Sequence, residues 1–176
     1  MKGDATMPTR QIRKLATDVV TLARAQGVML ATAESCTGGL VIGALTDIAG
    51  CSHAVDRGFV TYSNAAKTAM LGVPAALIER HGAVSAEVAG AMALGALKAS
   101  GAGFTVAITG IAGPDGGSEA RPVGLVHFAA ASSDGRVNRI ERRFGDRGRD
   151  QVRRMAVAAA LDLLKGMLEE TAVQST

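Results

Sequence analysis

Aromatic residues are scarce in this sequence, which contains no tryptophan, one tyrosine and four phenylalanines among its 176 residues. Hydrophobic residues nevertheless make up 48% of the chain, so the core must be built from alanine and aliphatic side chains on closely packed backbones. The scarcity also leaves no stacking platform for single-stranded nucleic acid. A chain of this length can bury a sufficient core by itself. We therefore expect one domain over residues 1–176, with its core at about 10–168.

Cysteine and histidine are also few. The two cysteines, Cys36 and Cys51, cannot form a disulfide framework, and no spacing of His and Cys is typical of a zinc site. We therefore expect neither a metal nor another cofactor. The sequence has no apolar run of signal-peptide or membrane-span length. These absences predict a soluble, cytoplasmic protein without membrane contact.

Positive charge is concentrated in the last third of the chain. The net charge is +3 overall, whereas the segment 136–154 alone contains eight arginines and three acidic residues. Such a segment favours an anionic partner, either a nucleic acid or a small phosphorylated ligand. It is equally typical of a solvated arginine face on a strand and a helix.

Apolar periodicity alternates between helical and strand patterns along the chain. Helices are expected over 11–25, 40–48, 65–70, 74–80, 87–100 and 150–168. Strands are expected over 28–32, 58–62, 104–108, 123–131 and 137–144. The loop 110–122 is too short for a helical crossover, so the fourth strand should run antiparallel. The predicted fold class is α/β, a three-layer α/β/α sandwich with a mixed sheet of about five strands, and residues 169–176 should be frayed.

Polar residues follow three of the predicted strands, at the end where ligands gather in α/β sheets. The first group is Glu34-Ser35-Cys36-Thr37-Gly38-Gly39, between a strand and a helix. Ser35 there can act as a nucleophile, with the unpaired helix amides near Cys36 to Gly39 stabilising an oxyanion, and Gly38 and Gly39 would let the backbone approach a ligand. The same residues are also consistent with a simple helix cap and turn. Cys36 is a rival nucleophile, because a helix N-terminus would lower its pKa, although its side chain should point into the core.

A serine nucleophile needs a base, and none of the three histidines, His53, His81 and His127, is obviously placed to serve. Ser-Lys chemistry is the remaining route. Lys67 is the candidate, one turn into the helix that follows the second strand, and Tyr62 is a possible proton relay. Burial beside Ser35 would lower the pKa of Lys67 into a useful range. Without such burial, a helical lysine is an ordinary surface residue.

The glycine-rich loop, residues 110–122, forms another polar group. Its glycines at 110, 113, 116 and 117 would present amides suited to a phosphate or a carboxamide. No Gly-Lys-Ser/Thr sequence follows these glycines and no helix begins there, so the loop is neither a Walker loop nor a dinucleotide fingerprint. Binding of ATP or NAD is therefore disfavoured.

Four segments of the chain resemble the CinA C-terminal domain family, whose PncC-type members are nicotinamide-nucleotide amidohydrolases. They are Thr32–Gly39, Gly58–Asn64 with Lys67, His81–Ser85 and Gly110–Gly117. The resemblance implies an α/β/α fold and a homo-oligomer. It also implies hydrolysis of the carboxamide of nicotinamide mononucleotide to nicotinic acid mononucleotide and ammonia, a step of pyridine nucleotide salvage.

The resemblance also implies roles for particular residues. Ser35 would be the nucleophile and Lys67 its partner, and Thr109 matches a hydroxyl position that can orient the substrate. An arginine near the start of the last helix would assist the site; Arg147 and Arg149 both fit, and Arg149 is favoured because the segment from 149 to 153 continues the helix in the family register. The residues expected to contact the substrate are Thr37, Gly38, Gly39, Thr109, Gly110, Gly113 and Arg149.

Two rival functions remain open at this point. One is a nucleic-acid or regulatory binding module, suggested by the arginines of 136–154 and by the competence and DNA-damage association in the family name. The other keeps the same residues but cleaves a different nucleotide-like amide. We favour a small phosphorylated substrate over a nucleic acid, because the chain offers so few aromatic residues for stacking.

Overall fold

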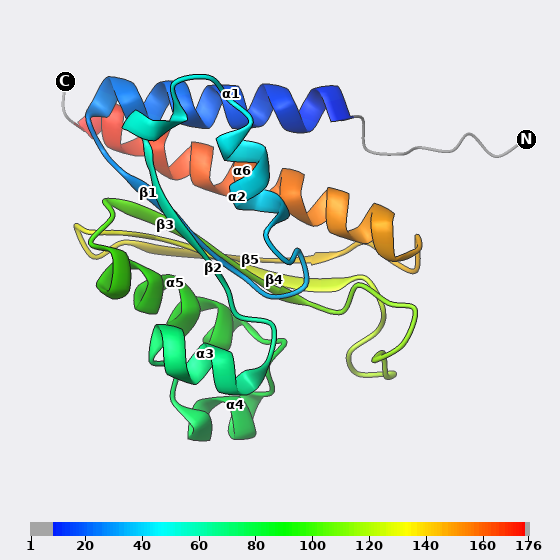
Figure 1. Cartoon of the computed structure of the whole chain (residues 1–176). Coiled ribbons are helices and arrows are strands. Elements are labelled where there is room, and N and C mark those ends of the chain that lie inside the picture. The colour runs from blue at the N-terminus through cyan, green and yellow to red at the C-terminus, as the bar shows by residue number, and fades with distance from the viewer. Residues whose placement is uncertain (1–8, 175–176) are drawn as a thin grey trace, which may run out of the picture.

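The computed structural model describes residues 9–174 and is shown in Figure 1. Its helices are α1 (Thr9–Gln26), α2 (Leu40–Thr46), α3 (Asn64–Leu71), α4 (Ala75–His81), α5 (Ala86–Ser100) and α6 (Arg149–Gln174), with a short 3-10 turn at Cys51–His53. Its strands are β1 (Leu30–Glu34), β2 (Val55–Val60), β3 (Phe104–Gly110), β4 (Leu125–Ser132) and β5 (Val137–Arg143). Within these residues, no helix is both long enough and apolar enough to cross a bilayer.

The strands form one five-stranded sheet in the order β2-β1-β3-β4-β5. β1 pairs in parallel with β2 and with β3, whereas β4 runs antiparallel to both β3 and β5. The predicted mixed sheet with an antiparallel fourth strand is therefore confirmed. The short loop after β3 leaves no room for a helical crossover, which is why the chain turns back.

Helices cover both faces of the sheet (Figure 1). α1, α2 and α6 share one hydrophobic cluster with strand residues such as Leu30, Val106 and Phe128. α3, α4 and α5 share the other with Ala33, Ala107 and Ala129. Because successive strand residues point to opposite faces, the small alanines on the second face let α5 pack close to the sheet. The predicted three-layer sandwich is confirmed.

The first two strands begin and end differently from the prediction. β1 covers Leu30–Glu34 rather than 28–32, because the amide of Val28 still donates to Ala23 at the end of α1. β2 covers Val55–Val60 rather than 58–62. Its register is fixed by pairing with β1, in which Glu34 lies opposite Val60, and the chain then leaves the sheet. Tyr62 consequently lies beyond the strand, in the connection to α3.

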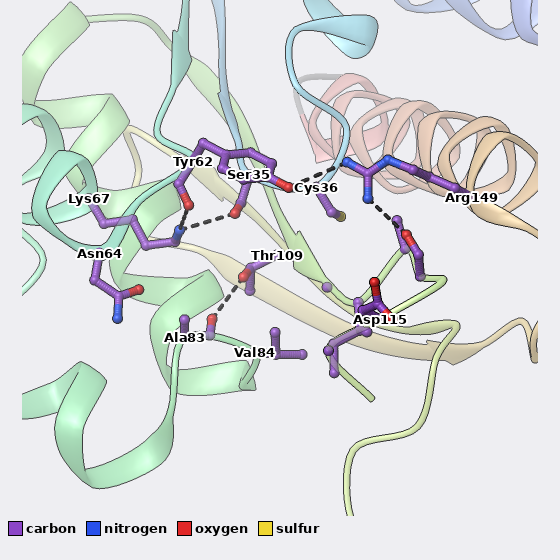
Figure 2. A pocket seen from close by; sticks show the side chains of 15 residues that line it. Ser35, Cys36, Tyr62, Asn64, Lys67, Ala83, Val84, Thr109, Asp115 and Arg149 are labelled. Carbon is purple, nitrogen blue, oxygen red and sulfur yellow. Dashed lines mark hydrogen bonds between the residues drawn. The ribbon is translucent and has the colours of Figure 1, made fainter. Parts of the chain in front are cut away.

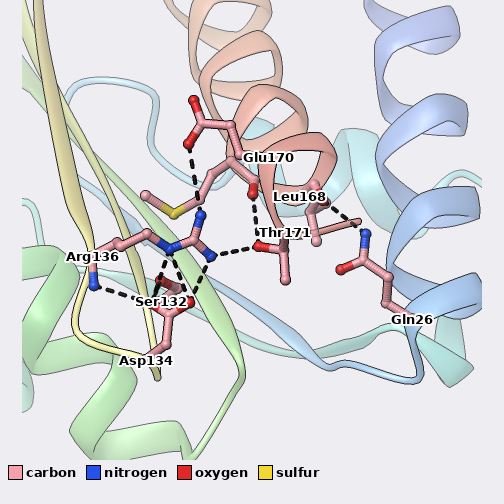
Figure 3. Close-up of polar contacts among 8 residues, drawn as sticks. Gln26, Ser132, Asp134, Arg136, Leu168, Glu170 and Thr171 are labelled. Carbon is pink, nitrogen blue, oxygen red and sulfur yellow. Dashed lines mark hydrogen bonds and ion pairs between the residues drawn. The ribbon is translucent and has the colours of Figure 1, made fainter. Parts of the chain in front are cut away.

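The prediction that the chain is frayed from residue 169 is wrong, because α6 continues to Gln174. Figure 3 shows the contacts that hold its last turns, with Arg136 of the β4–β5 hairpin donating to the Thr171 hydroxyl. Arg136 also lies 3.7 Å from the carboxylate of Glu170, and the Gln26 side chain of α1 donates to the carbonyl of Leu168 at 2.9 Å. These long-range contacts stabilise helical turns that sequence patterning assigned to solvent. Residues 175–176 lie outside the described range.

Candidate active site

A cleft of about 240 Å³ opens where the carboxyl ends of β1 and β3 meet the start of α3 and the start of α6. Figure 2 shows Ser35 and Lys67 pointing toward one another on one side of this cleft, with Arg149 reaching in from the opposite side. The predicted residues that line it are Ser35, Tyr62, Lys67, Thr109, Gly110, Gly113 and Arg149. The structure therefore brings together side chains that lie far apart in the sequence, at the edge where α/β sheets bind ligands.

Lys67 is buried next to Ser35. Its side chain is 1% exposed, and its Nζ lies 3.0 Å from Ser35 Oγ, within hydrogen-bond distance. Its helix begins at Asn64, where the Ser63 hydroxyl accepts from the amide of Ala66 and caps the first turn. The contact between Ser35 and Lys67 is direct, without an intervening side chain.

The remaining contacts of Lys67 are to two backbone carbonyl oxygens. Nζ also lies 2.9 Å from the carbonyl oxygen of Thr61 and 3.2 Å from that of Tyr62. A carbonyl can only accept, so a neutral amine gives its two protons to these oxygens and turns its lone pair toward the hydroxyl of Ser35. Burial lowers the pKa of Lys67 from its ordinary value because the charged form loses its hydration. Burial therefore favours the neutral amine, and the contacts allow its lone pair to face Ser35 Oγ.

Alternation along β1 sets the direction of Ser35. Thr32 and Glu34 point toward α2, whereas Ala33 points to the face covered by α3 to α5. The amide of Ser35 continues the pairing by donating to the carbonyl of Ile108 on β3 at 2.9 Å. The side chain of Ser35 therefore lies on the face of the sheet that α3 covers, and α3 carries Lys67.

Glu34 has a structural role beside the cleft that sequence reasoning did not assign. Its carboxylate is fully buried and accepts from the amides of Gly39, Val41 and Ile42 at the start of α2, at 2.8 to 3.0 Å. It also accepts from the hydroxyl of Thr37 at 2.7 Å. Glu34 is therefore the N-terminal cap of α2, supplied from the strand that precedes it.

This cap changes the interpretation of Thr37, Gly38 and Gly39. None of the three lines the cleft, and the amide of Gly38 donates to the carbonyl of Ser35 while that of Gly39 donates to Glu34. Both glycines have positive φ, 59° and 94°, so they serve the turn. The expected oxyanion site at their amides, and the expected substrate contact of Thr37, find no geometric support.

Cys36 does not share the properties of a reactive thiol. Its side chain is 5% exposed and packs in the cluster under α1, α2 and α6, as the sequence predicted. Burial raises the pKa of the Cys36 thiol to about 12, so that the thiolate is scarce near neutral pH. Of the two neighbouring side chains, only that of Ser35 is in hydrogen-bond contact with Lys67.

Tyr62 and Arg149 meet across the mouth of the cleft. The phenol of Tyr62 is 3.3 Å from Arg149 Nη2, and Nη1 of Arg149 lies 2.9 Å from the carbonyl oxygen of Gly113 (Figure 2). Only the backbone oxygen of Tyr62 contacts Lys67, so the geometry supports direct proton transfer rather than a relay through the phenol. Arg149 lines the cleft and Arg147 does not, so of the two only Arg149 is placed to contact a substrate there.

The hydroxyl of Thr109, at the end of β3, donates to the carbonyl of Ala83 at 2.8 Å. Its oxygen still has lone pairs available on the cleft side, where it can accept from an N–H group. Gly110 follows it on the strand and Gly113 lies in the glycine-rich loop, and both line the cleft. Gly116 lines it as well, whereas Gly117 does not.

The arginines of 136–154 do not act as one basic surface. Arg136 pairs with Asp134 and Glu170, whereas Arg149 enters the cleft. Arg153, which sequence reasoning did not single out, donates to the carbonyls of Cys36 and Thr37 at 3.1 and 2.9 Å. No signal in the sequence links it to those residues, because more than a hundred positions separate them.

Histidine takes no part in the cleft. None of the three histidines lines it, and His127, midway along β4, lies 3.6 Å from the carboxylate of Glu141 on the neighbouring strand. Within the described part of the chain, no group of three or more His, Cys, Asp or Glu side chains gathers as a metal site would require.

Comparison with known proteins places this arrangement among relatives. Residues 12–168 match the family described as the CinA C-terminal domain. Nicotinamide-nucleotide amidohydrolase PncC from Escherichia coli (strain K12) is 51% identical over 159 residues, covering 90% of this chain and 95% of that protein. The CinA-like protein of Synechococcus sp. (strain RCC307) is 52% identical over 152 residues, but this chain spans only 36% of its length.

Solved structures agree with the sequence relatives. The crystal structure of the competence/damage inducible protein CihA from Agrobacterium tumefaciens is 51% identical, with a TM-score of 0.89 over 94% of this chain and 99% of that one. A CinA superfamily protein from Klebsiella pneumoniae 700603 is 36% identical, with a TM-score of 0.85 over 90% of this chain and 98% of that one. The predicted family is confirmed: this chain belongs to the CinA C-terminal domain family.

Proposed function

We propose that this protein is a nicotinamide-nucleotide amidohydrolase that converts nicotinamide mononucleotide to nicotinic acid mononucleotide and ammonia, a salvage reaction of pyridine nucleotides. The observation that carries the proposal is the buried contact of 3.0 Å between Lys67 Nζ and Ser35 Oγ in a cleft. The name and the 95% coverage of the Escherichia coli relative supply the substrate. Besides water, the proposed reaction uses only side chains and backbone amides of the chain itself.

The first half of the reaction forms an ester. The lone pair of Lys67 takes the proton of the Ser35 hydroxyl as Oγ bonds to the carboxamide carbon. Collapse of the tetrahedral intermediate breaks the C–N bond, and Lys67 returns the proton to the leaving nitrogen, which departs as ammonia. In the second half, Lys67 takes a proton from water, the hydroxide attacks the ester, and the C–O bond to Ser35 breaks with return of the proton to Oγ.

We place the oxyanion against two amides at the cleft. One is the amide of Cys36, the residue after the nucleophile, which is a common donor in serine hydrolases. The other is the amide of Gly110. Ile108 already accepts from Ser35 on that edge of β3, and the next residue of a strand to face the same neighbour is two positions on, which is Gly110. Both residues line the cleft.

The rest of the substrate meets the remaining groups of the cleft. The Thr109 oxygen, whose proton is donated to Ala83, can accept from the carboxamide N–H. Arg149, at the mouth, retains donors for a phosphate. A cleft of about 240 Å³ lies just below the roughly 300–1,000 Å³ of ordinary small-molecule sites, which suits a substrate that inserts its ring and leaves its phosphate outside.

The test is an ammonia-release assay with nicotinamide mononucleotide and, separately, free nicotinamide. The wild-type protein should release ammonia only from the nucleotide, and Ser35→Ala should reduce that rate by at least about 1,000-fold while the protein stays folded by circular dichroism. Full activity of Ser35→Ala would contradict the mechanism. Activity on another nucleotide-like amide, but none on nicotinamide mononucleotide, would contradict the substrate and keep the mechanism.

A further inference from the structure

The nucleophile loop, Ser35–Gly39, is held from two sides by charged groups, the buried carboxylate of Glu34 and the half-buried guanidinium of Arg153. Glu34, at the end of β1, accepts five hydrogen bonds, of which those from Gly39, Val41 and Ile42 come from backbone amides. The guanidinium of Arg153, on α6, donates to two carbonyls of the nucleophile loop. Glu34 thus accepts hydrogen bonds from the loop and from the start of α2, and Arg153 donates hydrogen bonds to carbonyls of the loop.

The two groups reach the loop from different elements. Glu34 is the last residue of β1, and Arg153 lies one turn into α6, four residues after Arg149. Residues four apart share one face of a helix, so α6 presents Arg149 to the cleft and Arg153 to the loop. Gly38 leaves the space for this contact, since a Cβ there would lie 3.2 Å from Arg153 Nη2.

The backbone of Ser35 is held by hydrogen bonds on both sides in this arrangement. Its amide is bonded to β3, its carbonyl accepts from the amide of Gly38, and the carbonyl of the next residue is bonded to Arg153. A carboxylate that accepts backbone amides and a planar guanidinium that forks onto two oxygens are the strongest hydrogen-bonding groups a protein has. Here both groups bind a loop of five residues, and the reactive atom of that loop is Ser35 Oγ.

We propose that Glu34 and Arg153 are positioning residues for the hydrolysis: together they hold the backbone of the nucleophile loop so that Ser35 Oγ stays in contact with Lys67 Nζ. Neither touches the substrate, and each acts through the backbone. The inference rests on the proposed function for its kinetic consequence. The holding of the loop itself follows from the contacts alone.

The substitution Glu34→Gln tests the first group without changing its size. Oε1 accepts from the amide of Ile42 and Oε2 from those of Gly39 and Val41, so an amide nitrogen in either orientation faces at least one N–H donor. We expect kcat to fall about 100-fold, the loss typical of a displacement of about 1 Å in a reacting group. The KM for nicotinamide mononucleotide should change by less than a factor of about three, because no substrate contact is altered.

The substitution Arg153→Lys tests the second group and keeps its charge. One ammonium cannot reproduce a fork onto two carbonyls, so we expect kcat to fall about tenfold with KM unchanged. The matched control is Arg154→Lys, at the exposed neighbour on the same helix, which should retain the wild-type kcat. Since Arg153 is only half-buried, this variant should remain folded even where Glu34→Gln does not.

Amide hydrogen exchange provides a readout that needs no substrate. Exchange at Gly39, Val41 and Ile42 should be faster in Glu34→Gln and Arg153→Lys than in the wild type, and unchanged in Arg154→Lys. Wild-type kcat in a folded Arg153→Lys protein would overturn the proposal. Changes in kcat and KM that only follow a loss of stability would overturn it as well. Lack of ammonia release by the wild type would instead refute the proposed function, and the exchange rates would still decide whether these residues hold the loop.

Discussion

The two loops that border the cleft are built in opposite ways. Residues 35–37 of the nucleophile loop are buried, and the polar groups around them are bonded to β3, to Glu34 and to Arg153. The glycine-rich loop, by contrast, exposes every residue from 114 to 121, and its outer part is tied back to the fold by Arg121, which donates to the carbonyl of His81.

This difference separates chemistry from recognition. A reacting atom must be held to within a fraction of an ångström, whereas a loop that surrounds a substrate can adapt to it. Changes in the nucleophile loop and its partners should therefore affect the rate and the stability, and changes in the glycine-rich loop should affect mainly the apparent affinity. Four substitutions test this division.

The largest effect is expected from Lys67→Arg. An arginine stays protonated and cannot accept the proton of Ser35, so the rate of ammonia release should fall by about 1,000-fold or more, as for loss of a general base. The control is Lys98→Arg, at an exposed position of α5. A rate within tenfold of the wild type in a folded Lys67→Arg protein would show that Lys67 is not the base.

A smaller effect is expected from Arg149→Ala, which removes a side chain that bridges the β2–α3 connection and the glycine-rich loop by contacting Tyr62 and Gly113. Loss of one charge-assisted hydrogen bond to the phosphate costs about 1.5–3 kcal/mol, which corresponds to a decrease in kcat/KM of roughly 10- to 150-fold. Arg147→Ala, outside the cleft, should leave kcat/KM unchanged. Equal losses in the two variants would point to the general charge of the region.

Thr37→Val should act on stability. The Thr37 hydroxyl is buried and donates to Glu34 at 2.7 Å, and a hydrogen bond to a charged group contributes about 1.5–3 kcal/mol. We expect the free energy of unfolding in urea to fall by about 2 kcal/mol. Thr46→Val, which removes an exposed hydroxyl at the end of α2, is the control. A loss below about 0.5 kcal/mol, the range of ordinary surface substitutions, would show that the loop is less tightly held than its contacts indicate.

The smallest effect is expected from Asp115→Asn in the glycine-rich loop. Asp115 lines the cleft but is exposed, so water and salt screen its charge. Stability should change by less than about 0.5 kcal/mol, and kcat should stay the same while KM shifts by a factor of about two or three. A tenfold loss of kcat in steady-state assays would erase the contrast between the two loops.

The sequence predicted most of the fold because its signals were local. Alternating patterns gave the strands and helices, and the length of one loop gave the antiparallel direction of β4. The pairing of Ser35 with Lys67 was also within reach, since both follow strands whose ends share one edge of the sheet. The long α6 was missed at its end because its stabilising contact comes from Arg136, in a hairpin more than thirty residues away.

The bracing of the nucleophile loop was beyond sequence reasoning for a related cause. Displacing the first strand by two residues left Glu34 outside it, so the alternation that turns its carboxylate toward α2 was not applied. Arg153 reaches Cys36 across 117 positions, and nothing in the arginine-rich pattern distinguishes it from its neighbours. Contacts that depend on how two helices sit on a sheet are visible only once the sheet is built.

The cap that Glu34 places on α2 has a consequence for the end of the reaction. A free helix N-terminus binds anions, and the proposed product is an anion formed at the end of β1, the strand that leads into α2. With its amides already bound to Glu34, that helix offers the newborn anion no partner. The same carboxylate that caps α2 therefore removes one site that would otherwise bind the carboxylate of the acid product.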